Sequence, residues 1–558
     1  MTNTEIAKTF QLLAKVMELH GENPFKIRSY NNAYRTLRKL QEPLSDMTVQ
    51  EIGQIDGVGK AISAKIQELL ETGKMQTLQK YLDQTPEGVV DMLNISGFGP
   101  KKVYTVWQEL GIETMGELRY AINENRLLDL KGFGPKTQED LRQKLEYYLR
   151  SRHQFHFASL EAEAEELLDY LQGQIPEARL ALTGAIRRQT PVLRRIDLLL
   201  DRKPSDDLFQ PTGADNRFGL EKIQEEEDRV IRAKTSRGFP VCLHWTEPAH
   251  FGTALFRTTG HPDFLAAFNK AFPGVAVEGQ TDEAAIFAAA GMAPVDPGLR
   301  ESEWGLQWVQ NNDPNDLVSE SDIRGVVHSH STYSDGLNSL QEMAEYSKAQ
   351  GYEYLVITDH SQSAFYANGL KPSRVREQMA EIDQLNRALA PFRIFKGIES
   401  DILSDGSLDY DPDVLSEFEV VIASVHANLR MDEAKATQRL IRAIENPMTT
   451  MLGHPTGRLL LSRKGYPIDH RRVIDACADN GVCIELNANP YRLDLDWTWI
   501  PYALEKGVLI SINPDAHSTQ GIHDIHYGVL AARKGGLTRS QTLNTKSLEA
   551  FTNWLTSR

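Results

Sequence analysis

The C-terminal half of the chain alternates short apolar runs, rich in β-branched residues, with longer segments of helical periodicity. Apolar residues recur at helical spacing in 338–350, 372–390, 432–446 and 469–480. Runs such as 354–358, 420–425 and 508–513 lie between them and predict strands. Seven such strands alternating with helices predict a parallel barrel, in which functional side chains gather at the carboxyl ends of the strands.

Side chains that bind metals follow almost every apolar run in this half. The first run ends in two histidines one residue apart, His328 and His330. Residues i and i+2 of a strand point to the same side, so both imidazoles can bind one ion. Two surface histidines would explain an isolated pair equally well, but they do not explain the repetition. The nine candidates are His328, His330, Asp335, His360, Glu399, His426, His454, Asp515 and His517.

Six imidazoles and three carboxylates exceed the needs of one ion, because zinc takes about four ligands. The set therefore predicts two or three divalent ions that share a bridging carboxylate, an arrangement that suits hydrolysis of a phosphoester. Imidazole and carboxylate without thiolate suit zinc, manganese or iron. Asn487, Arg458 and Arg492 also follow strands. The two arginines are candidates for catalytic contacts to phosphate, and surface ion pairs would explain them equally well.

The motifs of this half resemble those of the PHP (polymerase and histidinol phosphatase) domain over residues 322–558. They are H-x-H, S-D-G, T-D-H, the glutamate of G-I-E-S-D, S-V-H, G-H-P and D-A-H. The resemblance implies a distorted (β/α)7 barrel with a trinuclear metal centre that hydrolyses phosphoesters, using Mn²⁺ or Zn²⁺. It implies one ion held by His328, His330, Glu399 and Asp515, a second by Glu399, His426 and His454, and a third by Asp335, His360 and His517.

Residues 1–150 read as short helices with three near-repeats, at 55–60, 95–101 and 130–136. Each has an apolar residue, then Gly-x-Gly, then a lysine that opens a helix whose free amides can bind phosphate. One copy would equally be an ordinary turn, but three copies resemble helix-hairpin-helix motifs, which hold a nucleic-acid backbone without reading its sequence. The DNA-binding candidates are Gly57, Gly59, Lys60, Gly97, Gly99, Lys101, Gly132, Gly134 and Lys136.

Residues 1–80 also resemble the small N-terminal domain of family X DNA polymerases, through NPFKIRSY at 23–30 and the hairpin that follows. The resemblance implies that Lys65 forms a Schiff base with a 5′-deoxyribose phosphate, in a pocket lined by Lys26 and Tyr30. A lysine on the exposed face of a helix is more often simply solvated.

Residues 151–312 resemble the palm and thumb of the same polymerases, with departures. The family pattern is Gly-Ser-x-Arg-Arg followed by Asp-x-Asp, and a third carboxylate comes later in the chain. Here Ala185 replaces the serine, Arg195 replaces the first aspartate and Cys242 stands at the third position, so only Asp197 remains. Polymerisation needs carboxylates that hold two Mg²⁺ ions. The sequence therefore predicts a degenerate palm without polymerase activity.

With 558 residues the chain has room for several domains, and the motifs place them at 1–80, 81–150, 151–312 and 322–558, with a polar linker at 310–321. The net charge of −16 argues against bulk electrostatic coating of nucleic acid. Residues 1–150 are nevertheless neutral, with 20 Lys and Arg against 20 Asp and Glu. The sequence has only three cysteines, and they lack metal-binding spacing. It also has no apolar run of membrane length and no secretory pattern, so we expect a cytoplasmic protein. A monomer is favoured.

The leading interpretation is a DNA-binding, metal-dependent nuclease. The resemblance implies a 3′→5′ exonuclease, with abasic-site cleavage as a further activity, on gapped, nicked or 3′-ended duplex. A phosphatase for a small phosphomonoester is the rival enzyme, although such a substrate needs no DNA-binding module. A non-catalytic scaffold at DNA gaps is disfavoured by the complete ligand set, and a gap-filling polymerase by Arg195 and Cys242.

Overall fold

The structure is a computed structural model that describes residues 1–40, 42–123, 126–151, 154–209, 219–226, 229–461 and 463–558. The chain divides into two compact units, Met1–Arg152 and His153–Arg558. Within the described residues, no helix combines the length and the apolar character that a membrane crossing requires.

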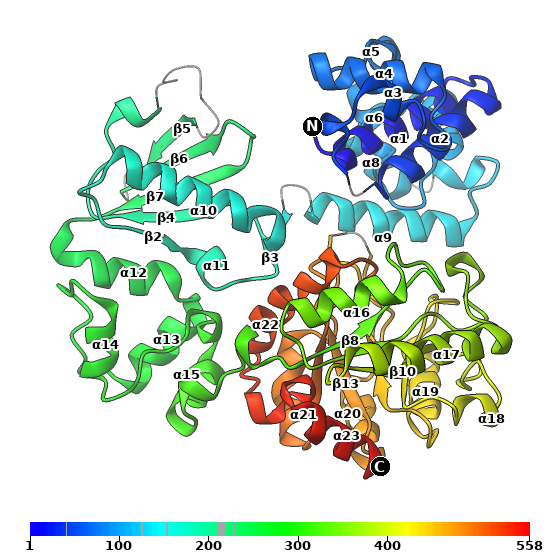
Figure 1. The fold of residues 1–558 in the computed structure, drawn as a ribbon. Helices are drawn as coiled ribbons and strands as arrows, with labels where there is room; N and C mark the ends of the chain where they lie inside the picture. The colour runs from blue at the N-terminus through cyan, green and yellow to red at the C-terminus, as the bar shows by residue number, and fades with distance from the viewer. Residues whose placement is uncertain (41, 124–125, 152–153, 210–218, 227–228, 462) are drawn as a thin grey trace. The chain divides into compact units, whose positions relative to one another are not determined.

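The first unit is entirely helical (Figure 1). Its helices are α1 (Asn3–Leu19), α2 (Pro24–Leu37), α3 (Val49–Ile52), α4 (Lys60–Thr72), α5 (Gln76–Leu82), α6 (Glu87–Met92), α7 (Pro100–Leu110), α8 (Met115–Asn123) and α9 (Pro135–Ser151). They enclose two hydrophobic clusters, and α1 contributes to both, with Phe10 in one and Val16 in the other. A capping box in which Thr2 and Glu5 exchange hydrogen bonds fixes the start of α1.

The three Gly-x-Gly repeats adopt one turn geometry. In each, the amide two residues before the helix donates to the carbonyl three residues earlier, as Val58 does to Ile55 at 2.9 Å. The first glycines have φ of 77°, 74° and 90° at Gly57, Gly97 and Gly132, a region that suits glycine. A Cβ at Gly59, Gly99 or Gly134 would meet open space. The first turns of α4, α7 and α9, which begin at Lys60, Pro100 and Pro135, therefore lie at accessible positions, where the amides that follow each first residue can face a phosphate.

The second unit begins with a mixed five-stranded sheet in the order β2-β4-β7-β6-β5. Its strands are β2 (Leu180–Thr183), β4 (Ile196–Leu200), β5 (Leu220–Glu226), β6 (Val230–Thr235) and β7 (Pro240–Trp245), while β1 (Phe155–His156) pairs with β3 (Val192–Leu193). Alternate residues of β4 face opposite ways. Leu198 packs with α10 (Phe157–Gln174), and Leu199 packs with α12 (Phe251–Thr259). Figure 1 shows α10 lying across one face of this sheet.

Four further helices, α11 (Gly184–Arg187), α13 (Pro262–Ala271), α14 (Glu283–Ala289) and α15 (Glu303–Asn311), accompany the sheet. The predicted linker at 310–321 is packed against the rest of its unit. Val318 is buried, and its amide donates to the carbonyl of Leu537 at 2.9 Å. Val318 joins the hydrophobic cluster of the barrel, whereas Leu317 joins that of α12 to α15 and bridges to Thr538 through its backbone, so the segment is packed between the two parts.

The barrel is a seven-stranded parallel sheet in sequential order, as the sequence predicted. Its strands are β8 (Gly325–Ser329), β9 (Tyr354–Ile357), β10 (Arg393–Asp401), β11 (Val420–Ser424), β12 (Met451–Leu452), β13 (Cys483–Asn487) and β14 (Ile510–Asn513). The barrel nearly closes where Ser329 pairs with Ala516, just beyond β14. The carboxyl ends of all seven strands therefore converge on one rim.

Helices surround these strands in Figure 1. They are α16 (Leu340–Ala349), α17 (Pro372–Leu389), α18 (Pro412–Leu415), α19 (Glu433–Ile444), α20 (His470–Asn480), α21 (Ile500–Glu505), α22 (Ile525–Lys534) and α23 (Leu548–Thr556). The four predicted helical segments are confirmed as α16, α17, α19 and α20, within two residues at each end. Phe551 of α23 stacks on Tyr354 at 4.6 Å inside the barrel, in a cluster with Phe395 and Met451.

Candidate metal centre

Glu399, near the end of β10, lies at the middle of the predicted ligand set. Its side chain is 1% exposed and its carboxylate faces five imidazoles. The nearest nitrogens of His328, His330, His360, His426 and His454 lie 3.3, 3.6, 2.9, 3.1 and 2.9 Å from its oxygens. Because these residues follow four other strands, only closure of the barrel could bring them around one carboxylate.

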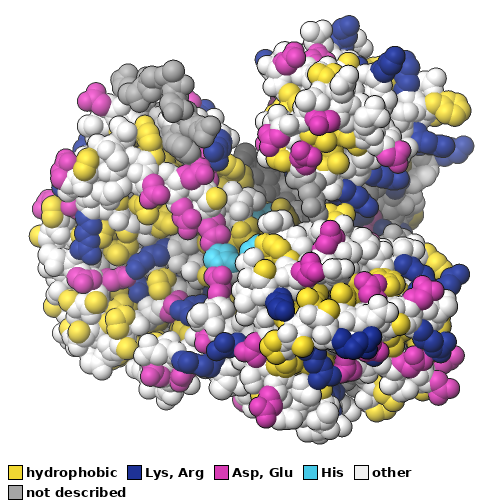
Figure 2. Space-filling view, viewed as in Figure 1, with side chains coloured by type: hydrophobic (Ala, Val, Ile, Leu, Met, Phe, Trp, Pro, Cys, Tyr) yellow, Lys and Arg dark blue, Asp and Glu magenta, His cyan; other side chains and the backbone are white. Residues whose placement is uncertain are grey.

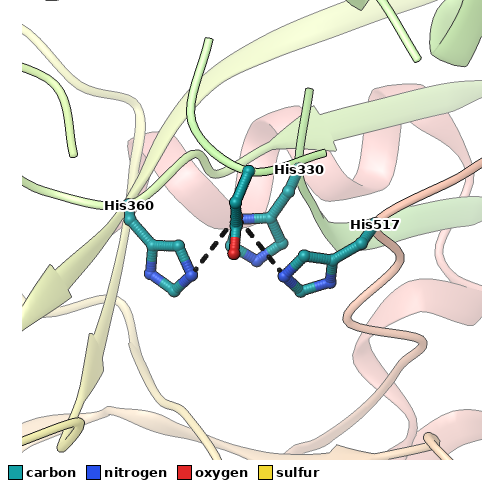
Figure 3. Close-up of side chains that lie close together, drawn as sticks. His330, His360 and His517 are labelled. Atoms are coloured by element: carbon teal, nitrogen blue, oxygen red, sulfur yellow. Dashed lines mark ion pairs between the residues drawn. The ribbon is translucent and has the colours of Figure 1, made fainter. Parts of the chain in front are cut away.

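The remaining candidates lie beside this centre. Asp515 Oδ1 is 3.1 Å from His330 Nε2 and 3.5 Å from His328 Nε2. Figure 3 shows His330, His360 and His517 around a single carboxylate, with dashed ion pairs from two of them. That carboxylate is Asp335, whose Oδ1 is 3.6 Å from His360 Nε2 and 3.5 Å from His517 Nε2.

Three overlapping groups in this set have ligand atoms close enough to hold an ion, all within 4.8 Å of one another. They are His328, His330 and Asp515; His360, Glu399 and His426; and His330, Asp335, His360 and His517. These groups contain eight of the nine residues that the sequence predicted, and the ninth, His454, contacts Glu399 at 2.9 Å.

The strand argument for the His-x-His pair was wrong in its detail. His328 has φ of 66°, and the register between β8 and β9 shifts around it, so β8 is irregular at this point. His330 lies beyond the end of the strand. The two rings still converge, with centroids 5.3 Å apart. Asp515 also has positive φ, at 52°. Non-glycine residues in this region cost about 1–3 kcal/mol each and cluster at functional sites.

The surroundings of His328 show that this set of side chains is suited to divalent cations. Its Nδ1 lies 2.5 Å from Glu485 Oε2, so the proton on Nδ1 is directed to that carboxylate. The buried Nε2 faces Glu399 and Asp515, and within the described part of the chain it forms no hydrogen bond of acceptable geometry. Glu485, Asp515 and Glu399 raise the pKa of His328 against the effect of burial. A cation between the two carboxylates would take the place of the Nε2 proton and satisfy the same atoms.

Burial and the neighbouring charges set the protonation of the cluster. Burial, with His517 and His360 beside it, lowers the pKa of His330 to about 3, so this imidazole is neutral and able to bind a metal. Burial alone would raise the pKa of Asp335, but the adjacent imidazoles, His517 first, lower it to about 2. The site therefore contains an ionised carboxylate beside neutral nitrogen at physiological pH.

Three buried carboxylates that the sequence analysis missed orient the predicted ligands. Glu485 accepts from His328, and Asp401 accepts from Nδ1 of His426. Asp359 accepts from the hydroxyls of Ser331 and Ser334 in the loop between His330 and Asp335. The available signal was a charged residue inside an apolar strand, since Glu485 interrupts the run at 482–486.

The two candidate phosphate-binding arginines differ in their surroundings. Arg458 donates to the carbonyls of Arg492 and Leu493 and to Asp496, so its guanidinium holds the 492–496 loop together. Arg492 Nε lies 3.7 Å from Asp515 Oδ2, beside the centre, with a side chain 22% exposed. Asn487 donates to Asp515 and to Glu485 and thereby supports one predicted ligand.

The predicted lyase residues lie on two helices of the first unit. Lys65 is half-buried on α4, whereas Lys26 is exposed and Tyr30 half-buried on α2. Tyr30 packs on Phe10, and burial raises its pKa. No hydrogen bond or ion pair among the described residues joins Lys65 to Lys26 or Tyr30. The lysines that open the hairpin helices, Lys60, Lys101 and Lys136, are all exposed.

The positions that the sequence analysis assigned to a degenerate palm, Arg195, Asp197 and Cys242, lie together on and beside the five-stranded sheet. Arg195 Nε donates to Asp197 Oδ1 at 2.9 Å. Cys242 is buried beside Asp197 on the neighbouring strand. His244, which the sequence analysis did not consider, also approaches Asp197, at 3.1 Å.

Hairpin helices, a mixed sheet and a parallel barrel with a cluster of histidines and carboxylates at one rim are features of multidomain proteins that process DNA. Comparisons with known proteins agree, part by part. Family models match residues 1–75 ("Helix-hairpin-helix domain"), 89–146 ("SAM-like Helix-hairpin-helix tandem") and 327–489 ("PHP domain").

The whole chain is 33% identical to the DNA polymerase/3′-5′ exonuclease PolX of Bacillus subtilis, over 99% of both proteins. The chain therefore belongs to the family X DNA polymerases that carry a C-terminal PHP domain. The barrel region alone is similar to proteins called probable phosphatases. That of Thermoanaerobacter sp. strain X514 is 26% identical over 39% of this chain and 89% of its own length, and that of Shewanella frigidimarina is 25% identical over 42% and 89%.

Proposed function

We propose that this family member is a metal-dependent phosphodiesterase that removes nucleotides from DNA 3′ ends, and that it has lost polymerase activity. In this proposal residues 1–80 and 81–150 hold gapped, nicked or 3′-ended duplex, residues 151–312 are a scaffold, and residues 322–558 hydrolyse the phosphodiester. The observation that carries it is the cluster of nine ligand side chains around Glu399, in the same chain as three hairpin turns suited to a phosphate backbone.

The ligand geometry supports a centre of two or three ions, with Mn²⁺ or Zn²⁺ matching the imidazole and carboxylate donors. Such ions, when bound, supply Lewis acidity at the phosphoryl group and make water more acidic. Glu399 would bridge two of them, because its two oxygens face different imidazoles. Arg492, partly exposed beside Asp515, is the better placed of the two arginines to contact a substrate phosphate.

The test is digestion of a 3′-labelled gapped duplex with Mn²⁺, run beside a mobility-shift titration on the same preparations. Glu399→Ala, His328→Ala and His330→Ala should lose digestion by at least about 10²-fold, because each removes a side chain from the shared centre. DNA binding should remain, because the hairpins are untouched. Glu419→Ala, at the opposite end of the barrel, is the matched control and should keep both activities. Full digestion by Glu399→Ala with a chelator-sensitive wild type would refute the bridging role.

A phosphatase for small phosphomonoesters is the second candidate, favoured by the similarity of the barrel to the probable phosphatases. Hydrolysis of p-nitrophenyl phosphate and of the labelled duplex by one preparation separates the two functions. A catalytic efficiency at least about 10²-fold higher on DNA supports the nuclease. A higher catalytic efficiency on p-nitrophenyl phosphate than on DNA, unchanged when competing DNA is added, would support the phosphatase instead of the nuclease.

A further inference from the structure

Sulfur, nitrogen and oxygen ligands form a second cluster in the five-stranded sheet, outside the barrel. Asp197 of β4 and Cys242 of β7 are register partners on neighbouring parallel strands. His244 follows Cys242 by two residues on β7 and so points to the same face of the sheet. One ligand atom from each of the three side chains lies within 4.8 Å of the other two.

The spacing of this cluster suits a single tetrahedral ion. His244 Nε2 is 3.1 Å from Asp197 Oδ1. Nitrogen and oxygen ligands at zinc distances of about 2.0–2.1 Å lie about 3.3 Å apart in a tetrahedron. Asp197 is 5% exposed and Cys242 2% exposed, and Asp197 packs against Gly184, where a Cβ would lie 2.8 Å from its Oδ2. The sheet and this glycine therefore hold the carboxylate in place.

His244 lines a cavity of about 390 Å³, together with residues that include Leu199, Trp245 and His250. Asp197 and Cys242 are buried and are not among the lining residues. The cavity therefore reaches the cluster on its His244 side, and a fourth ligand would come from that side.

Two arginines oppose a cation at this place. Arg232, the register partner of Cys242 on β6, is paired with Glu226. Arg195 Nε bonds to the same Asp197 oxygen that faces His244, at 2.9 Å. The Arg195 side chain is 42% exposed and can move into solvent, whereas the Asp197 side chain is only 7% exposed. A buried carboxylate needs a counter-charge, and a cation bound there would replace the arginine in that role.

We propose that Asp197, Cys242 and His244 bind one borderline-soft divalent ion such as Zn²⁺, and that Arg195 occupies Asp197 when the ion is absent. Thiolate and imidazole select zinc or cobalt over magnesium, which takes oxygen ligands. Binding releases the thiol proton of Cys242 to solvent. The palm position where the family pattern holds magnesium carboxylates would thus be a site for a different class of metal, independent of the barrel.

Cobalt spectroscopy on the full-length protein tests this site separately from the barrel, because none of the nine barrel candidates is a cysteine. The wild type should give a near-ultraviolet thiolate-to-cobalt charge-transfer band whose final amplitude corresponds to one thiolate-bound ion per chain. Cys242→Ser should abolish the band, and His244→Ala should weaken cobalt binding at least about tenfold. Cys477→Ala, which removes a buried cysteine on α20, is the control and should keep the band. Arg195→Ala should tighten cobalt binding several-fold, because it removes the group that competes for the Asp197 carboxylate.

Zinc content measured on the same preparations gives a second readout, with one ion fewer per chain in Cys242→Ser than in the control. Unfolding temperatures in chelator should match between wild type and Cys242→Ser, which shows that the variant is folded. A wild type without the band, or a band that survives Cys242→Ser, would overturn the proposal. The cluster would then be a hydrogen-bonded Arg–Asp–His network only.

Discussion

Replacing Glu485 by glutamine tests whether buried carboxylates orient the metal ligands. Glu485 is fully buried and accepts four hydrogen bonds. Its Oε2 accepts from His328 Nδ1 at 2.5 Å and Asn513 Nδ2 at 2.8 Å, and its Oε1 accepts from the His454 amide at 3.0 Å and Asn487 Nδ2 at 3.1 Å. Glutamine has the same shape but a single acceptor oxygen.

Whichever way the glutamine amide turns, its NH₂ group faces two donors. If the carbonyl of the glutamine faces His328, the backbone amide of His454 has no acceptor. If the carbonyl faces His454, the proton on His328 Nδ1 has no acceptor. A buried donor without a partner costs about 1–3 kcal/mol. Removing a partner that orients a ligand weakens metal binding by about 10–100-fold, or about 1.4–2.8 kcal/mol. We therefore expect Glu485→Gln to weaken Mn²⁺ or Zn²⁺ binding by that factor.

The assay is competition for Mn²⁺ or Zn²⁺ against a chelator of known affinity, with nuclease rate followed as metal is raised. We expect Glu485→Gln to bind the metal more weakly and to recover most of the nuclease rate at saturating metal. Glu419→Gln is the matched control, because this glutamate accepts from Arg393 and the Lys396 amide at the other end of the barrel. Metal affinity in Glu485→Gln that equals that of Glu419→Gln, with both variants folded, would refute the positioning role.

Three further outcomes are expected. Borohydride should trap the wild type on an incised abasic duplex but not Lys65→Ala, and equal trapping in both would place the nucleophile elsewhere. The protein should not extend a primer with dNTPs and Mg²⁺ or Mn²⁺, and extension that disappears in Asp197→Ala would contradict the loss of polymerase activity. His526 donates hydrogen bonds to Glu161 and Glu320, and these bonds, that to Glu161 first, raise the pKa of His526 to about 9 against the effect of burial. The folded pKa exceeds the unfolded value of about 6.5, so this stabilisation is complete below pH 6.5 and lost towards pH 9. The difference in unfolding temperature between wild type and His526→Gln should shrink over that window.

Surface charge agrees with the expectation that DNA binding does not rest on bulk attraction. Figure 2 shows Lys and Arg side chains interspersed with Asp and Glu over the visible face. Backbone amides at the three hairpin turns need no net positive charge to contact phosphates, because a helix N-terminus is itself electropositive.

The sequence by itself determined the barrel, its helices and the identity of the clustered side chains. Each candidate follows its own strand, and parallel strands in sequential order end on one rim, so local patterns were enough to place Glu399 and His454 at the same site. The hairpin turns were predictable for the same reason, because Gly57 and its counterparts are required by a local backbone conformation.

Only the tertiary structure decided which groups support or compete with these residues. The irregularity of β8 at His328 depends on Thr358, 29 residues further along, which accepts from the Ser329 amide. The role of Glu485 depends on His328, 157 residues earlier, whose ring it contacts. In the sequence Glu485 is visible only as a charged residue inside an apolar run, and nothing there indicates its partner. The pairing of Arg195 with Asp197, and the approach of Cys242 and His244, likewise depend on sheet register. Periodicity and turn residues report local conformation, whereas contacts across strands arise only when distant segments pack.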